Sequence, residues 1–163
     1  MTFFKKILFP ADLSDASLKV VPYVEEMRKK FEAELHVIHV VHVTHYYNQL
    51  DMPVDYLGNV ETEITAWAEK KLKGFIDENF KGEKVTMQIL RGRPGNEIIN
   101  YAESNEIDVI IMGHSSTGLK RAIFGSVAGH AVKYSPVPVM VIRVPPSSGP
   151  ALGDMLEIVG AGL

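Results

Sequence analysis

Short apolar segments alternate with longer segments of helical spacing along nearly the whole chain of 163 residues. The short segments predict strands, because each has only five to nine residues and several are rich in Val and Ile. Apolar residues spaced three and four apart predict an amphipathic helix between each pair of strands. The expected strands are 5–9, 35–43, 85–90, 107–112 and 137–144, and the expected helices are 14–31, 58–78, 96–105 and 125–134.

This strict alternation predicts one fold class. Right-handed crossovers through helices give a parallel sheet with helices on both faces. We therefore expect an α/β fold with a five-stranded, parallel, doubly wound sheet. Residues 1–145 form the expected domain, and residues 146–163 read as a Pro/Gly linker with a short apolar tail. In that tail Leu152, Met155, Leu156 and Val159 have the helical spacing of a segment that could dock on a neighbouring subunit, whereas glycines at 153, 160 and 162 argue against a long stable helix.

Composition excludes several classes of protein. With 17 Lys and Arg against 20 Asp and Glu, the net charge of −3 argues against nucleic acid as the main partner. The absence of cysteine excludes disulfides, thiolate metal sites and cysteine catalysis. No apolar run approaches the roughly 20 residues of a membrane span, and the first run ends at Pro10, too soon for an export signal. We expect a cytoplasmic protein with no membrane partner.

The loop after the first strand carries a carboxylate at the expected ligand edge. Doubly wound sheets bind ligands beyond the carboxyl ends of their strands, where the strand order reverses. This loop contains Pro10, Ala11, Asp12 and Ser14. Two interpretations stay open: a turn with a helix cap at Asp12 or Ser14, or a carboxylate that accepts hydrogen bonds from a ribose or a base.

The segment 112–127 indicates an anion site. It holds three glycines and three consecutive hydroxyl residues, and a Gly-Ser pair opens the next helix. Small residues let backbone N–H groups approach phosphate oxygens, and a helix N-terminus adds about half a positive charge. Lys120 and Arg121 add cations. The pattern favours phosphate binding, and the alternative is a flexible loop whose glycines only make turns.

Four blocks of sequence resemble the universal stress protein family: 6–14, 90–98, 108–114 and 125–142. They follow one another in the family's order over residues 5–144. The resemblance implies a Rossmann-like fold similar to that of the adenine nucleotide alpha hydrolases. It also implies a small stress-response protein that binds ATP or a related adenine nucleotide (ADP or AMP), with or without Mg²⁺, as a regulatory switch.

The nucleotide-binding branch of that family carries Gly, two residues, Gly, nine residues, and then Gly-Ser or Gly-Thr. Here nine residues separate Ser115 from Gly125, and only His114 separates Ser115 from Gly113, so the loop is one residue short and lacks the second glycine. Serine keeps its N–H and adds a hydroxyl donor, but it resists the positive φ that glycine accepts.

The resemblance carries family roles over to particular residues. It implies an adenosine end at Pro10, Ala11, Asp12 and Val40, and a phosphate end at Met112, Gly113, Gly125, Ser126 and Val127, with Ser115 and Ser116 as substitutes for the missing glycine. It further implies a homodimer through the strand at 137–144. No positioned general base or arginine finger is visible, so we expect at most slow ATP hydrolysis. A dimeric interaction module that binds no nucleotide stays open as the alternative.

Four histidines recur at every third position: His36, His39, His42 and His45. A shared metal ion would need them on one face, whereas side chains alternate along a strand. His36 and His42 should point one way and His39 the other, so we expect no metal site. We expect His39 to be a hydrogen-bonded core residue, with His42 and His45 near the ligand cleft.

Overall fold

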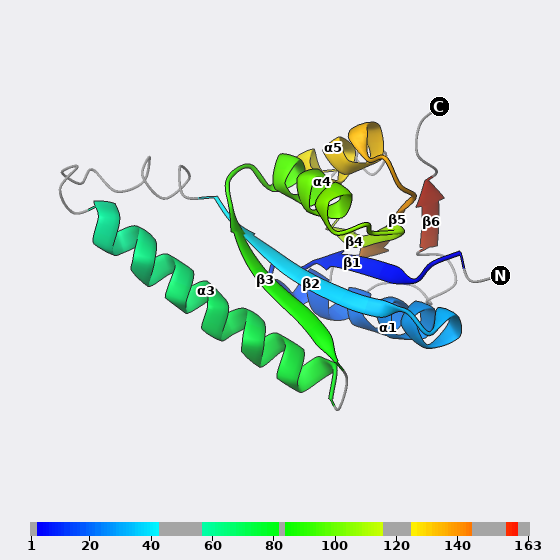
Figure 1. The fold of residues 1–163 in the computed structure, drawn as a ribbon, viewed down its shortest axis with the longest axis horizontal. Coiled ribbons are helices and arrows are strands. Elements are labelled where there is room, and N and C mark those ends of the chain that lie inside the picture. The colour runs from blue at the N-terminus through cyan, green and yellow to red at the C-terminus, as the bar shows by residue number, and fades with distance from the viewer. Residues whose placement is uncertain (1–2, 43–56, 82–83, 116–124, 145–155, 160–163) are drawn as a thin grey trace.

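The computed structural model describes residues 3–42, 57–81, 84–115, 125–144 and 156–159 (Figure 1). Strands and helices alternate as predicted as far as β5. In chain order they are β1 (Lys6–Pro10), α1 (Asp15–Phe31), β2 (Glu34–Val41), α3 (Leu57–Asn79), β3 (Val85–Arg91), α4 (Pro94–Ser104), β4 (Val109–Ser115), α5 (Ser126–Tyr134), β5 (Val139–Val144) and β6 (Leu156–Val159).

The strands form one sheet in the order β3-β2-β1-β4-β5-β6. β1 to β5 run parallel, which confirms the predicted five-stranded parallel sheet. The order reverses between β1 and β4, because the chain builds outward from β1 through β2 to β3 and then returns to the other side of β1. The carboxyl ends of β1 and β4 therefore lie at the switch point, where such sheets bind ligands.

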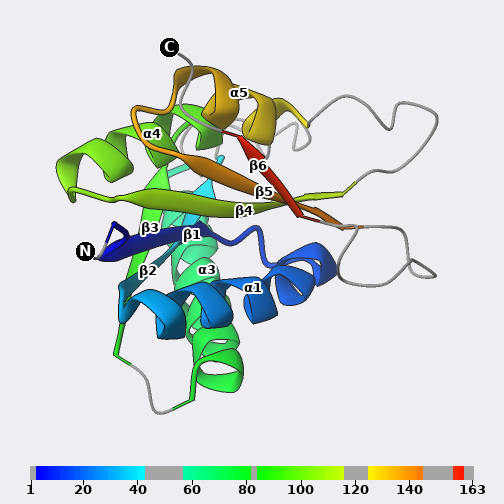
Figure 2. The ribbon, with the colours of Figure 1, turned by 90° about the vertical axis from the view of Figure 1, so that its right-hand side faces the viewer.

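The sixth strand corrects two expectations about the end of the chain. β6 runs antiparallel along β5, with Val139 opposite Val159 and Ile142 opposite Leu156 (Figure 2). Residues 156–159 thus extend the sheet and do not form the expected helix, while residues 151–155 lie outside the described part of the chain. β5 is also not an open edge at which a second copy could pair, as the homodimer implied by the resemblance requires, because β6 pairs with the backbone groups of its outer side. A homodimer through residues 137–144 would have to displace β6.

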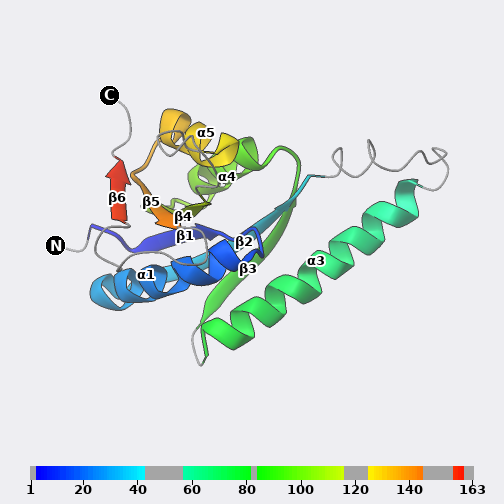
Figure 3. The same ribbon diagram turned by 180° about the vertical axis from the view of Figure 1, so that it is seen from behind.

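Helices cover both faces of the sheet (Figure 3). On one face, Val20 and Val24 of α1 and Leu72 of α3 pack in a core with Phe9 and Ile111. On the other, α4 and α5 contribute a second core whose buried members include Leu8, Ile98, Ile110 and Ala131. Because both faces are covered, successive side chains of the central strands are all buried, and this produces the continuous apolar runs in the sequence.

Two histidines of β2 confirm the expected alternation of side chains. His36 faces α4, where its Nδ1 lies 2.9 Å from the hydroxyl oxygen of Tyr101. His39 points to the opposite side and donates from Nδ1 to the carbonyl oxygen of Ala11 at 2.8 Å. Among the described residues, no three His, Asp or Glu side chains are placed to hold a metal ion. His45 lies outside those residues, so the absence of a metal stays a prediction.

In the described part of the chain, none of the helices combines the length and the apolar character that a bilayer crossing requires.

Candidate functional site

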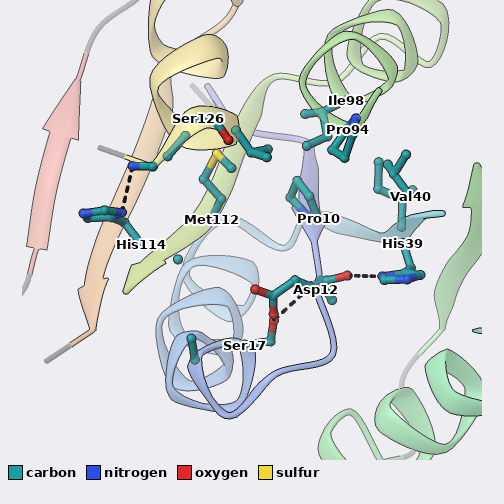
Figure 4. A pocket seen from close by; sticks show the side chains of 17 residues that line it. Pro10, Asp12, Ser17, His39, Val40, Pro94, Ile98, Met112, His114 and Ser126 are labelled. Atoms are coloured by element: carbon teal, nitrogen blue, oxygen red, sulfur yellow. Dashed lines mark hydrogen bonds between the residues drawn. The ribbon is translucent and has the colours of Figure 1, made fainter. Parts of the chain in front are cut away.

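A cavity of about 300 Å³ opens at the carboxyl ends of the strands, between β1 and β4 (Figure 4). Its walls come from the loop after β1, the tips of β2 and β4, and the first turns of α1, α4 and α5. It therefore lies where the strand order reverses.

The structure gathers the residues predicted from the sequence around this cavity. Every one of them whose side chain is described lines the wall: Pro10, Ala11, Asp12, Val40, Met112, Gly113, Gly125, Ser126 and Val127. Ser116 and the side chain of Ser115 lie outside the described part of the chain. That these residues bind a ligand stays a prediction.

His39 near the end of β2 and His42 just after it lie beside two hollows. His39 lines the cavity, so it is more than the core residue that we expected, and it also lines a neighbouring hollow. His42 does not line the cavity; it lines the neighbouring hollow, with Ile64 and Trp67 of α3.

Asp12 is held by hydrogen bonds that all reach one oxygen of its carboxylate. Oδ1 accepts from the backbone N–H of Ser14 at 3.0 Å, from the Ser14 hydroxyl at 2.6 Å and from the Ser17 hydroxyl at 2.6 Å. Ser14 occupies the N-cap position of α1, yet its side chain bonds to Asp12 and not to an amide of the helix. No side-chain helix cap forms at Ser14, whereas the bond from the Ser14 N–H gives Asp12 a part in the turn itself.

These bonds keep the carboxylate ionised. Partial burial raises the pKa of Asp12, but the hydrogen bonds from Ser14 and Ser17 lower it by more, and the nearby His39 lowers it further. The net result is a pKa below the ordinary value. Oδ2 has no hydrogen-bond partner among the described residues, and Asp12, although its carboxylate is partly shielded from water, keeps a solvent-exposed surface. It presents an anionic acceptor to a ligand that carries hydroxyl or amino donors.

Ser17 is a site residue that the sequence analysis missed. Its side chain is only 5% exposed, and its oxygen also accepts the backbone N–H of Asp12 at 3.1 Å. It thereby fixes both the backbone and the carboxylate of Asp12. The signal in the sequence was a serine in helical spacing with the buried Val20 and Val24, because a polar residue on the apolar stripe of a helix needs a partner.

The opposite side of the cavity is the N-terminus of α5. Gly125 is its N-cap, and the first turn, residues 126–129, carries no acidic residue. The first amides of a helix have no partner within the helix, and its dipole favours an anion at this end. The arrangement can therefore accept phosphate oxygens at Ser126 and Val127, both of which line the cavity.

The two glycines of this region differ in what surrounds them. A Cβ at Gly113 would lie 2.7 Å from Cγ2 of Val20, so the packing of α1 on β4 requires glycine there. A Cβ at Gly125 would lie 3.6 Å from Nδ1 of His114, which is ordinary contact. Packing thus explains Gly113 without a ligand, whereas it does not explain Gly125.

We expect Gly113→Ala to lower the free energy of unfolding by about 1–3 kcal/mol, the usual effect of overpacking a core. Val20 is fully buried and cannot move away freely. Chemical denaturation of the parent, Gly113→Ala, Val20→Ala and the double variant measures the coupling between the two positions. Val20→Ala should cost less when Gly113→Ala is present, and strictly additive losses would contradict this account.

Comparison with known proteins gives a family match over most of the chain. Residues 3–143 match the model of the Universal stress protein family. Universal stress protein MJ0531 of Methanocaldococcus jannaschii is 35% identical over 147 residues, which cover 87% of this chain and 84% of that protein. Universal stress protein MJ0577 of the same organism is 32% identical over 155 residues, covering 86% of this chain and 95% of that protein.

Solved structures agree in fold. The structure of MJ0577 superposes with a TM-score of 0.73 at 29% identity, covering 89% of this chain and 99% of that one. A universal stress protein crystallised in complex with cAMP gives a TM-score of 0.56 at 17% identity, covering 86% and 97% of the two chains.

Proposed function

This chain belongs to the universal stress protein family, and from that premise we propose that it binds ATP or a related adenine nucleotide as a regulatory switch. The adenosine would lie near Pro10–Asp12 and Val40, and the phosphates at the start of α5. The proposal places the protein in the cytoplasm.

One observation carries this proposal: a single cavity joins an ionised carboxylate to a helix N-terminus. A nucleotide has matching chemistry at its two ends. Its ribose hydroxyls and amino group are donors for the open Oδ2 of Asp12, and its phosphates are anions for the free amides of α5. The cavity volume of about 300 Å³ lies at the lower end of the usual range for small-molecule sites. The complex of a related fold with cAMP, an adenine nucleotide, supports the choice of ligand class.

The described cavity wall favours binding over rapid turnover. Its titratable side chains, within the part of the chain that the structure describes, are Asp12, His39 and His114. All three already make hydrogen bonds to the protein, and none is an arginine that could stabilise the charge of a phosphoryl transition state. We therefore propose at most slow hydrolysis of ATP.

The homodimer that the family resemblance implies stays part of the proposal. Because β6 occupies the outer side of β5, a second copy would take the place of β6 on that strand.

Calorimetric titration tests the proposed ligand. Freshly purified protein is first denatured, and the small molecules that it releases are identified by mass spectrometry. After nucleotide removal, the protein is titrated with ATP, ADP and AMP, each with and without Mg²⁺. We expect saturable heat with at least one of them. No heat up to about millimolar concentrations would contradict nucleotide binding and favour the interaction module.

A further inference from the structure

A buried histidine links the tip of β4 to the start of α5 at the proposed phosphate side of the cavity. His114 follows Gly113 on β4, and its side chain is 8% exposed. Its side chain lies on the same face of the sheet as those of Ile110 and Met112, which pack in the core under α4 and α5. Figure 4 shows its ring at the side of the cavity, joined by a dashed line to the backbone at the start of α5.

The link is a hydrogen bond from the backbone N–H of Gly125 to Nδ1 of His114, at 3.1 Å. Gly125 is the N-cap of α5, so no bond within the helix satisfies this N–H. The two residues are eleven positions apart in the sequence. The imidazole therefore fixes where α5 begins relative to the tip of β4.

The direction of the bond defines the chemical state of the ring. A backbone N–H can only donate, so Nδ1 must be unprotonated and accept. His114 thus acts as an acceptor in its neutral form. Because His114 accepts the Gly125 N–H, the N–H groups of Ser126 and Val127 are the next donors for an anion at this end of the cavity.

We propose that His114 is a positioning residue for phosphate: by accepting the Gly125 N–H, it holds the first turn of α5 so that its free amides face the cavity. The inference rests on the proposed function, because the ligand it serves is the phosphate group of the nucleotide. Donors contribute fully to binding only when they are held close to the productive geometry before the ligand arrives. His114 supplies that order through the Gly125 N–H.

Two substitutions separate the hydrogen bond from the volume of the side chain. In His114→Asn the amide oxygen stands one bond from Cγ, as Nδ1 does in histidine, so it can accept the same N–H. His114→Leu fills similar space in the buried site but has no acceptor. A role in packing alone would be satisfied better by leucine, whereas the proposed role is satisfied only by asparagine.

The first readout is hydrogen exchange of the Gly125 amide, followed by NMR. We expect slow exchange in the parent and in His114→Asn, and exchange at least about tenfold faster in His114→Leu, because one hydrogen bond of ordinary strength is lost. The second readout is calorimetry with ATP and with adenosine. ATP should bind about five- to tenfold more weakly to His114→Leu and near parental strength to His114→Asn, while adenosine should bind equally to all three proteins.

The outcomes distinguish the failure of each idea. If His114→Leu binds ATP as tightly as the parent, or if adenosine weakens as much as ATP, the role of His114 is overturned and nucleotide binding stands. If His114→Asn behaves like His114→Leu in both readouts, the hydrogen bond is not the cause and the inference is likewise overturned. A parent protein that binds no nucleotide would overturn the proposed function and, with it, this inference.

Discussion

Gly125→Val is expected to abolish ATP binding while the fold survives. Among the described residues, a Cβ at this position meets only His114, at 3.6 Å, so one methyl group fits beside it. The two further methyl groups of valine would crowd the Nδ1 acceptor and the space in front of the α5 amides, where phosphate must approach. Calorimetry with ATP measures the loss, and chemical denaturation verifies that the variant is folded.

Gly125→Ala is the matched control for this experiment. Its single methyl group is at ordinary contact distance, and the φ of Gly125 is −57°, which any residue adopts. Alanine should therefore retain ATP affinity within a few-fold of the parent. A valine variant that binds ATP as the parent does would place the phosphates away from α5 and refute the assigned phosphate end.

Asp12→Ala is expected to weaken ATP binding by about 1–3 kcal/mol, the usual contribution of a hydrogen bond to a charged group. This corresponds to roughly a five- to 150-fold rise in Kd. The loss should be as large for adenosine as for ATP, because Asp12 serves the adenosine end. Asp12→Asn keeps the shape of the side chain without its charge, so its Kd should lie between those of the parent and Asp12→Ala. Equal affinity of Asp12→Ala and the parent would exclude Asp12 from the ligand contacts.

The pH dependence of the same proteins tests the ionised state of Asp12. Its pKa in the folded protein is below the ordinary value of 3.8, so folding is stabilised above that pH and the contribution disappears as pH falls through the lowered pKa. The stability advantage of the parent over Asp12→Asn should therefore be present at neutral pH and vanish on acidification. Ser17→Ala removes one of the bonds that lower the pKa of Asp12, so in that variant the contribution of the ionised carboxylate should be smaller and should be lost completely at a higher pH than in the parent.

The main fold was predictable because its signals are local. A strand that is covered on both faces reads as a continuous apolar run, as in Val109–Met112 of β4. Each helix shows buried apolar residues three or four positions apart, as Val20 and Val24 are in α1. Alternation and the handedness of crossovers then predict a parallel sheet with helices on both faces, whereas the order of its strands is known only from the structure.

β6 could not be predicted in the same way. Its four residues belong to a stretch whose apolar positions match a helical period, and short apolar segments carry little preference of their own. What makes them a strand is the unpaired side of β5, a partner set by the tertiary fold.

The candidate site was predictable only in part, for a related reason. Asp12 could be found because a carboxylate directly follows a strand at the switch point. Ser17 and His114 act through bonds to Asp12 and Gly125, and those bonds depend on how the loop after β1 and the start of α5 are folded. The sequence contains these residues but not the distances that give them a role.

The close approach of α1 to β4 has a consequence for how this family diverges. Since Gly113 makes room for Val20, selection for a stable domain alone is enough to preserve it, even in a lineage that has given up its ligand. Among the described residues nothing makes the same demand at Gly125, so a bulky side chain becomes tolerable there once no phosphate has to approach. The first glycine of the pattern is thus inherited with the architecture, whereas a small residue before Ser126 is the feature that a working phosphate site would preserve.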